Sequence, residues 1–273
     1  MTNPHGTPIW YELLTPDHAS AKRFYDAVVG WTIEDAPAGP IDYRMIRAGA
    51  DNSGANAGGV MQITPEMASG GAQPGWLFYV GVDDVDATAA QVTANGGTVV
   101  MAPHDLPGVG RMAFVTDPQG APFYIMRGAS PEDSTAFAPG ERGPRNGHCG
   151  WNELWTSNVD GALAFYRTMF GWENPSTMDM GPMGGYHFVH LPDDIVLGAL
   201  AKAPQPGQPP RWAFYFWVSD VEAAMATAKA QGGTITAGPH DVPGGLRTVM
   251  GTDPHGATFA LVGPGLANNG KDS

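Results

Sequence analysis

The sequence is poor in cysteine, in basic residues and in charge overall. Its 273 residues include one cysteine, Cys149, which excludes an internal disulfide and a cysteine-rich zinc module. Lys and Arg number 14 against 27 Asp and Glu, for a net charge of −13. Because a net acid without a basic stretch attracts neither a phosphate backbone nor anionic lipid, we expect no nucleic-acid partner and no membrane partner.

Long apolar runs are missing as well. No run approaches the roughly 18 apolar residues that span a bilayer, and residues 1–8 have neither the charged nor the apolar region of a secretory signal. The expected location is therefore cytoplasmic. What is present is 42% hydrophobic residues, enough for a sizeable core, together with 38 Gly and 25 Pro, which indicate many turns.

Two parts of the sequence are alike enough to be copies of one domain. The segment IWYELLT at Ile9–Thr15 returns as GWNELWT at Gly150–Thr156. Further on, Trp76–Arg127 aligns with Trp212–Gly263 without a gap, and roughly two dozen of some fifty positions are identical. Similarity of this extent indicates an internal duplication.

The duplication predicts the domain boundaries. We expect a first domain at residues 7–127 and a second at residues 147–263. The segment 128–146 between them is rich in Pro, Gly, Ser and charge, which is typical of a linker, and residues 264–273 are expected to be a tail.

Each copy shows the order β-α-β-β-β twice, so that the whole chain holds four such units. In the first unit, a strand at Ile9–Thr15 precedes a helix, whose apolar residues, Phe24 and Tyr25 among them, recur at helical spacing and are expected in the core. Asp17 is the expected N-cap of this helix and Gly30 its stop. The pattern then predicts strands near 32–34, 43–47 and 59–63, a polar loop at 64–75, a strand at 76–82, a helix at 84–95, and strands near 98–101, 110–116 and 122–126.

These motifs, in this order and present twice, resemble the vicinal oxygen chelate superfamily of glyoxalase I, bleomycin-resistance proteins and extradiol dioxygenases. They are Phe-Tyr followed by Gly-Trp at the end of the first helix and Asp-Pro-x-Gly before the last strand. The chain is most similar to a two-domain glyoxalase-like branch. The resemblance implies an α+β fold with tandem glyoxalase-like domains, in which four βαβββ units form curved mixed sheets around small-molecule cavities, often with a divalent metal.

The metal positions of that superfamily hold no suitable ligands in this chain. Zinc, iron or manganese needs several nitrogen or oxygen donors. We therefore expect no metal and no other cofactor at this place. The positions that match the family's ligands are Trp10 and Trp151, Leu77 and Ala213, and Tyr124 and Ala260.

Histidines elsewhere leave room for a relocated metal. His187 and His190 are three apart on a predicted strand, so they point to opposite faces and share no ion without a bulge. His104 and His240 lie in repeated Pro-His-Asp-x-Pro-Gly segments. Each segment is interpreted either as a turn in which the imidazole caps backbone groups or as a His–Asp pair at a cavity mouth.

Strand alternation predicts an aromatic cavity with one carboxylate in each copy. If Trp10 occupies the former ligand position, Glu12 shares its face and Tyr11 packs on the helix; Trp151 and Glu153 repeat this arrangement. Such a lining suits a flat or hydrophobic small molecule. The expected ligand-binding residues are Trp10, Tyr79, Tyr124, Trp151, Trp155, Tyr215 and Trp217.

Glu12 and Glu153 are the candidate catalytic residues. Desolvation among tryptophans raises the pKa of a carboxyl group, which suits a general acid or base near neutrality. The alternative is a structural role, with each glutamate hydrogen-bonded to an Arg or a Tyr across the sheet. The available arginines are Arg44, Arg47, Arg111 and Arg247.

Two classes of function follow. The first is a protein like the bleomycin-resistance proteins, which binds a small hydrophobic or aromatic molecule in a metal-free cavity. The second is an enzyme, a lyase, isomerase or dioxygenase-like protein, that acts on a small carbonyl or aromatic substrate through the cavity glutamates or a relocated metal. A third interpretation is a scaffold protein whose pockets no longer serve a function. The expected partner is a small molecule, and the chain is expected to be a monomer or a homodimer.

Overall fold

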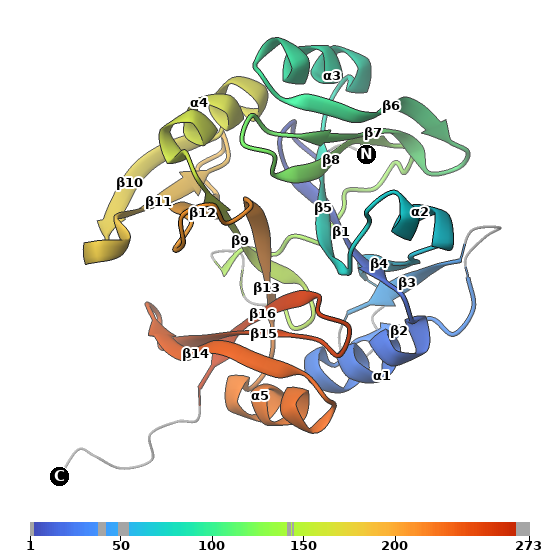
Figure 1. Cartoon of the computed structure of the whole chain (residues 1–273), viewed down its shortest axis with the longest axis vertical. Coiled ribbons are helices and arrows are strands. Elements are labelled where there is room, and N and C mark those ends of the chain that lie inside the picture. Colours follow the sequence, from blue (N-terminus) through green and yellow to red (C-terminus); the bar gives the residue numbers. More distant parts are fainter. Residues whose placement is uncertain (1–2, 38–41, 49–54, 141–142, 144, 266–273) are drawn as a thin grey trace. The chain divides into compact units, whose positions relative to one another are not determined.

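The computed structural model describes residues 3–37, 42–48, 55–140, 143 and 145–265 (Figure 1). The first half of the chain forms β1 (Pro8–Thr15), α1 (His18–Val29), β2 (Thr32–Ile33), β3 (Tyr43–Arg47), β4 (Asn56–Gln62), α2 (Pro65–Ser69), β5 (Gly75–Gly81), α3 (Val85–Ala94), β6 (Thr98–Leu106), β7 (Gly110–Thr116) and β8 (Pro122–Gly128). The second half forms β9 (Cys149–Thr156), α4 (Val159–Phe170), β10 (Glu173–Asp179), a 3-10 turn (Gly181–Met183), β11 (Gly185–His190), β12 (Val196–Lys202), β13 (Arg211–Trp217), α5 (Val221–Ala230), β14 (Thr234–Val242), β15 (Leu246–Thr252) and β16 (Thr258–Pro264).

The fold is α+β, with two eight-stranded mixed sheets of identical topology. The strand order is β2-β3-β4-β1-β5-β8-β7-β6 in the first sheet and β10-β11-β12-β9-β13-β16-β15-β14 in the second. In the first sheet β1 pairs with β4 and β5 with β8 in parallel, and in the second sheet β9 pairs with β12 and β13 with β16 in the same way. The four βαβββ units and the duplication predicted from the sequence are confirmed.

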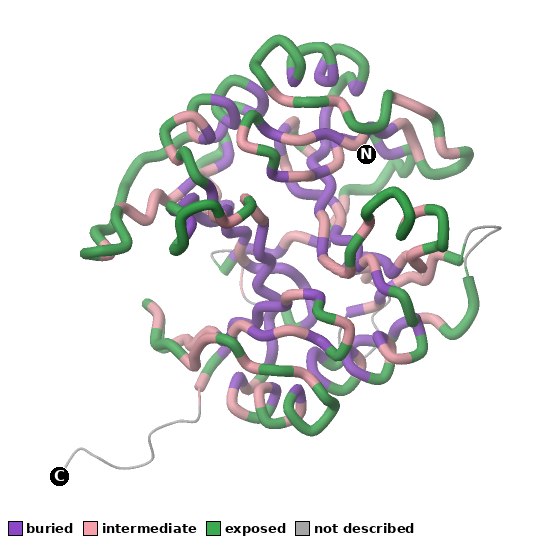
Figure 2. Tube along the Cα trace, viewed as in Figure 1, coloured by how far each residue is buried: buried purple, intermediate pink, exposed green. Residues whose placement is uncertain are grey.

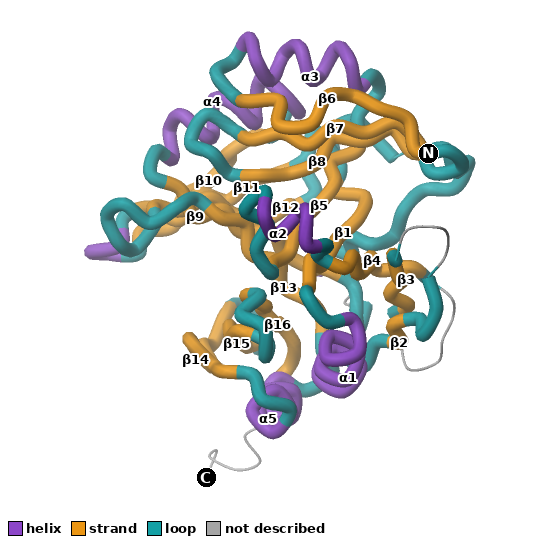
Figure 3. The backbone as a smooth tube through the Cα atoms, turned by 45° about the vertical axis from the view of Figure 1, so that its right-hand side comes forward, coloured by secondary structure: helices purple, strands orange, loops and turns teal. Residues whose placement is uncertain are grey.

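The chain divides into two compact units, and each unit takes elements from both halves of the sequence. In the first unit α3 lies along β6, β7 and β8, and in the second α5 lies along β14, β15 and β16 (Figure 3). Among the described residues, no helix is long and apolar enough to cross a membrane. The first unit is Met1–Tyr11, Leu77–Arg142 and Trp151–Ala213, and the second is Glu12–Trp76, Gly143–Gly150 and Phe214–Ser273.

The ends of the helices follow local sequence signals, as predicted. The Asp17 carboxylate accepts a hydrogen bond from the Ser20 backbone N–H at 3.0 Å, and Gly30 closes α1 with a φ of 79°. Buried residues, purple in Figure 2, alternate with exposed ones along α1 and α4 because each helix packs one apolar stripe. Phe24 and Tyr25 lie on that stripe and are buried.

Two segments differ from the prediction. The polar stretch 64–75 contains the short helix α2, which begins at Pro65 and is capped by Thr64, whose hydroxyl accepts from the Met67 N–H at 3.2 Å. The strand expected near 98–101 runs on to Leu106. It can contain Pro103 because β6 is an edge strand and its pairing shifts register between Met101 and His104.

Each tyrosine of the repeated Phe-Tyr motif binds the turn aspartate of the opposite half of the sequence. In the second unit the Tyr25 hydroxyl donates to Asp253 at 3.2 Å. In the first unit Tyr166 donates to Asp117 at 3.2 Å, and both side chains are buried. Burial raises the pKa of Asp117 and raises the pKa of both tyrosines well above the ordinary value. We call these two contacts the Tyr–Asp clasps.

The predicted linker is partly packed. The Ser134 hydroxyl donates to the Ile9 carbonyl, and the Ser134 N–H donates to the Asn3 side chain at 2.8 Å. Ala136 and Ala138 are buried. The segment therefore contributes to the core of the first unit. Of the predicted tail, residues 266–273 lie outside the described part of the chain.

A pH dependence of stability is expected from His18 at the start of α1. This side chain is buried, and burial lowers its pKa although Asp42, 3.3 Å away, opposes the shift. Below a pH of about 6.5 the unfolded chain protonates at this residue before the folded chain does, so the free energy of unfolding falls as the pH falls through that range. Urea unfolding at pH 7.5 and 5.5 should show a smaller loss in His18→Gln than in the unchanged protein. An equal loss in both would contradict this assignment.

Candidate functional site

The glutamate of the second half lies on an aromatic face of the second sheet. Glu153 on β9 is beside Ala199 on β12, and Phe188 on β11 is opposite the same alanine. Register partners in a sheet share a face, so these side chains project together. Trp151 and Trp155 flank Glu153 at spacings of two and share that face. We call Trp151, Glu153, Trp155, Tyr186 and Phe188 the second-half face.

A chain of hydrogen bonds crosses this face and ends on the glutamate. Trp151 Nε1 donates to the Tyr186 hydroxyl at 3.0 Å, and that hydroxyl donates to Glu153 Oε2 at 2.6 Å. The second distance is typical of a charge-assisted bond. Glu153 is 4% exposed, whereas Trp151 and Tyr186 are only half-buried. The glutamate thus has a tyrosine partner across the sheet, one of the two partner types expected.

Three rings of the face lie close to one another. Trp151 and Tyr186 are parallel within 1° at a centroid distance of 6.5 Å. Phe188 stands edge-on to both, at 6.0 Å from Trp151 and 5.5 Å from Tyr186. On the same face, the Nε1 of Trp155 has no hydrogen-bond partner among the described residues. The second-half face therefore combines half-buried rings with one buried acid.

The glutamate of the first half occupies the equivalent place in the first sheet. Glu12 is completely buried and lies beside Gly59 on β4, as Glu153 lies beside Ala199. The two glutamates were expected to superpose, and the matching strands and register agree with this. Tyr43 is the equivalent of Tyr186.

Sequence reasoning missed both tyrosines. Tyr43 is opposite Met61, two residues beyond the partner of Glu12, and Tyr186 is opposite Ala201, two residues beyond the partner of Glu153. Their separation of 143 positions differs from the 141 of the glutamates, because the connections between strands differ in length. A comparison of the two repeats that allowed for this shift would have found the Glu–Tyr pattern.

Three of the predicted ligand-binding residues come together in the first unit. Tyr79 and Tyr124 are register partners on β5 and β8, and their rings stack at 4.3 Å and 14°. Phe114 lies 4.7 Å from the Tyr124 ring, and Trp10 packs against the same cluster. This group is aromatic and partly buried.

The last two predicted residues, Tyr215 and Trp217, lie on β13 and are buried. The Tyr215 hydroxyl donates to the Met250 sulfur at 3.5 Å, and the Trp217 backbone N–H donates to the His148 carbonyl at 2.9 Å. These contacts belong to the second unit. The predicted ligand-binding residues therefore belong to both units.

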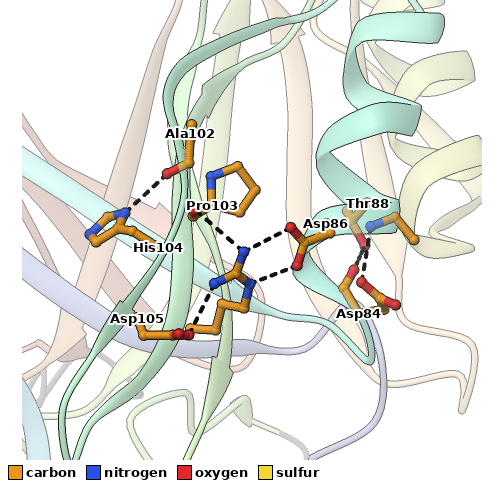
Figure 4. A network of polar contacts seen from close by, with 9 residues as sticks. Asp84, Asp86, Thr88, Ala102, Pro103, His104 and Asp105 are labelled. Atoms are coloured by element: carbon orange, nitrogen blue, oxygen red, sulfur yellow. Dashed lines mark hydrogen bonds and ion pairs between the residues drawn. The ribbon is translucent and has the colours of Figure 1, made fainter.

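The prediction that the two Pro-His-Asp segments form turns is wrong, because both histidines lie on strands. His104 lies on β6 opposite Met112, and His240 lies on β14 opposite Thr248. His104 Nδ1 is 3.0 Å from the Ala102 carbonyl, so its imidazole does bind a backbone group. The Asp105 carboxylate binds Arg111 at 3.0 Å instead of the histidine, within a network that includes Asp86 (Figure 4).

The other histidine pair binds two separate partners. His187 Nδ1 is 3.1 Å from the Thr177 hydroxyl, and His190 Nδ1 is 2.8 Å from Asp194. Within the described ranges, no group of three or more His, Cys, Asp or Glu side chains is placed to hold a metal ion. Trp151, Ala213 and Ala260, at the family's metal positions in the second half, lack a suitable donor atom, so they do not fit a metal.

Comparison with protein-family models confirms the superfamily that the sequence motifs and the fold indicate. The model of the Glyoxalase/Bleomycin resistance protein/Dioxygenase superfamily matches residues 8–125 and 145–261. The chain belongs to this superfamily. It is 36% identical over 261 residues to "Putative glyoxylase CFP32" of Mycobacterium tuberculosis (strain CDC 1551 / Oshkosh), with 95% of each chain covered. It is 33% identical to the anthracycline biosynthesis protein DnrV of Streptomyces peucetius, with 94% of this chain and 93% of the relative covered.

Solved structures of the superfamily share the fold at low sequence identity. Homoprotocatechuate 2,3-dioxygenase from Arthrobacter globiformis is 14% identical with a TM-score of 0.63, covering 98% of this chain and 88% of the other. The Mn(II)-bound glyoxalase from Novosphingobium aromaticivorans is 19% identical with a TM-score of 0.60, covering 95% and 82%. These likenesses confirm the tandem glyoxalase-like architecture.

Proposed function

We propose that this protein binds a small, flat aromatic molecule on the second-half face, without a metal. The observation that carries the proposal is the buried Glu153 carboxylate, held by Tyr186 at 2.6 Å beneath half-buried rings. A planar ligand gains by stacking on Trp151 or Tyr186. A carboxylate has about four lone-pair sites, so Glu153 can accept a hydrogen bond from a ligand hydroxyl while it keeps that of Tyr186.

The chemistry of the relatives agrees with an aromatic ligand. Two of them are named anthracycline biosynthesis proteins, DnrV and DauV, and anthracyclines carry hydroxyl groups on planar fused rings. The residues at the family's metal positions support binding without a metal, because tryptophan, leucine and alanine side chains cannot ligate one and the single tyrosine, Tyr124, offers only one oxygen. A hydroxylated planar aromatic compound is therefore the ligand class that we propose.

The Tyr186–Glu153 hydrogen bond also supports an enzyme as the second candidate. A short bond between a phenol and a carboxylate lets the pair deliver a proton to a bound molecule or accept one from it. An isomerase or a lyase that acts on a carbonyl next to an aromatic ring would need this chemistry. Turnover of the bound compound would distinguish this candidate from binding alone.

Titration with a planar hydroxylated aromatic compound tests the proposal. The purified chain is dialysed against EDTA, analysed for metals, and titrated with 1,4-dihydroxyanthraquinone by calorimetry and tryptophan fluorescence. We expect saturable binding of one molecule per chain, with quenching of fluorescence because Trp151 stacks on the ligand. Absence of saturable binding, or binding only after a metal is added back, would contradict the proposal.

A further inference from the structure

The two glutamate faces differ at one register position. The residue beside the glutamate is Gly59 in the first half and Ala199 in the second. In a parallel pair, register partners project to the same side of the sheet. A side chain that packs on the Cα of Gly59, in the direction a Cβ would take, therefore lies on the same side of the sheet as Glu12. This position is a glycine in one copy and carries a methyl group in the other.

The glycine makes room for a tyrosine. A Cβ placed ideally on Gly59 would be 2.2 Å from the Tyr43 hydroxyl oxygen and 2.3 Å from two of its ring carbons. The end of the Tyr43 ring therefore occupies the place that a side chain would take. Because Ala199 does carry that Cβ, Tyr186 cannot lie against its strand in the same way.

The two tyrosines accordingly differ in pose. Tyr186 stands parallel to Trp151 and donates to Glu153. Tyr43 lies against β4 on the side that Glu12 shares. The other positions of the first-half face carry Leu14 and Met45, where the second-half face has Trp155 and Phe188. At these two positions the first-half face has flexible side chains in place of flat rings, whereas Trp10, two residues before Glu12 on β1, corresponds to Trp151.

We infer that the residue at position 59 or 199 decides which glutamate face accepts a planar ligand. Gly59 lets Tyr43 cover the first-half face, which is Glu12, Leu14, Tyr43, Met45 and Met61. Ala199 keeps Tyr186 off its strand and so holds its ring parallel to Trp151 on the second-half face. The identity of the ligand in this inference rests on the proposed function. The difference between the two tyrosine poses rests on the packing at Gly59.

Exchanging the two residues tests the inference. Ala199→Gly should let Tyr186 settle against β12 and lower the affinity for 1,4-dihydroxyanthraquinone by at least about tenfold. Gly59→Ala should displace Tyr43 and raise the stoichiometry from one to two molecules per chain. Gly75→Ala is the control, because a Cβ there meets nothing within 4 Å, and it should change neither quantity. Unchanged affinity in Ala199→Gly would overturn the inference.

Crystal structures of the free variants separate this inference from the proposed function. We expect the Tyr43 ring to leave β4 in Gly59→Ala and the Tyr186 ring to lose its parallel alignment with Trp151 in Ala199→Gly. If the rings move as described but the unchanged protein binds no planar aromatic compound, the proposed function is wrong. The conclusion that residues 59 and 199 determine the positions of the two tyrosine rings would still hold. If the rings keep their positions, the inference fails whatever the ligand does.

Discussion

Changing Glu153 to Gln should weaken binding of a planar hydroxylated aromatic compound by about 10- to 100-fold, with little change in stability. A hydrogen bond to a charged group contributes about 1.5–3 kcal/mol, and the neutral amide removes the charge while keeping the shape. Tyr186 retains an oxygen to donate to, so the free energy of unfolding should change by less than about 2 kcal/mol. Calorimetric titration and urea unfolding measure the two quantities.

Two further variants sharpen this prediction. Tyr186→Phe removes the hydroxyl between Trp151 and Glu153 and should also weaken binding. Glu12→Gln is the matched control, since Glu12 has the same register position in a face that Tyr43 covers, and it should leave the affinity unchanged. If Glu153→Gln and Tyr186→Phe both bind with full affinity, the second-half face is not the binding site. If stability falls in Glu153→Gln and the affinity of the folded fraction is unchanged, the glutamate is a structural anchor.

Separating the two halves should abolish the folded monomer. Each compact unit combines elements of both halves, and each Tyr–Asp clasp joins the first-half and second-half sequences. The indole of Trp31 likewise donates to the Gly147 carbonyl at 2.7 Å, and that of Trp172 to the Gly6 carbonyl at 2.9 Å. Without its partner, a half exposes aromatic side chains that are otherwise buried. Residues 3–128 and 145–265 expressed alone should show no dispersed monomer spectrum.

Co-expression provides the control for this experiment. When both halves are produced together they should form a one-to-one complex with the circular dichroism of the intact chain, because every clasp can then form. The predicted domain boundaries would be boundaries of independent folding only if one half alone gave a cooperative unfolding transition and a monomeric mass. That result would contradict the role assigned to the clasps.

The local features of the fold could be predicted because neighbours in sequence cause them. Asp17 caps α1 through an N–H three residues away, and Gly30 ends it with a left-handed backbone. Asp117 closes its hairpin by accepting from the Gln119 and Ala121 N–H groups at 2.9 and 2.8 Å. Repetition of such features in two copies was enough to predict the tandem fold and the equivalence of Glu12 and Glu153.

Partners across the sheets were decided by the tertiary structure alone. Tyr186 reaches Glu153 from a strand 33 positions away, and Tyr25 reaches Asp253 over 228 positions, so no local pattern encodes either bond. The extension of β6 through Pro103 depended on its place at the edge of the sheet, which the sequence does not state. The sequence by itself determined which residue types each strand carries and how they alternate. Which side chains then meet depends on strand order and register, because pairing between distant strands places them within bonding distance.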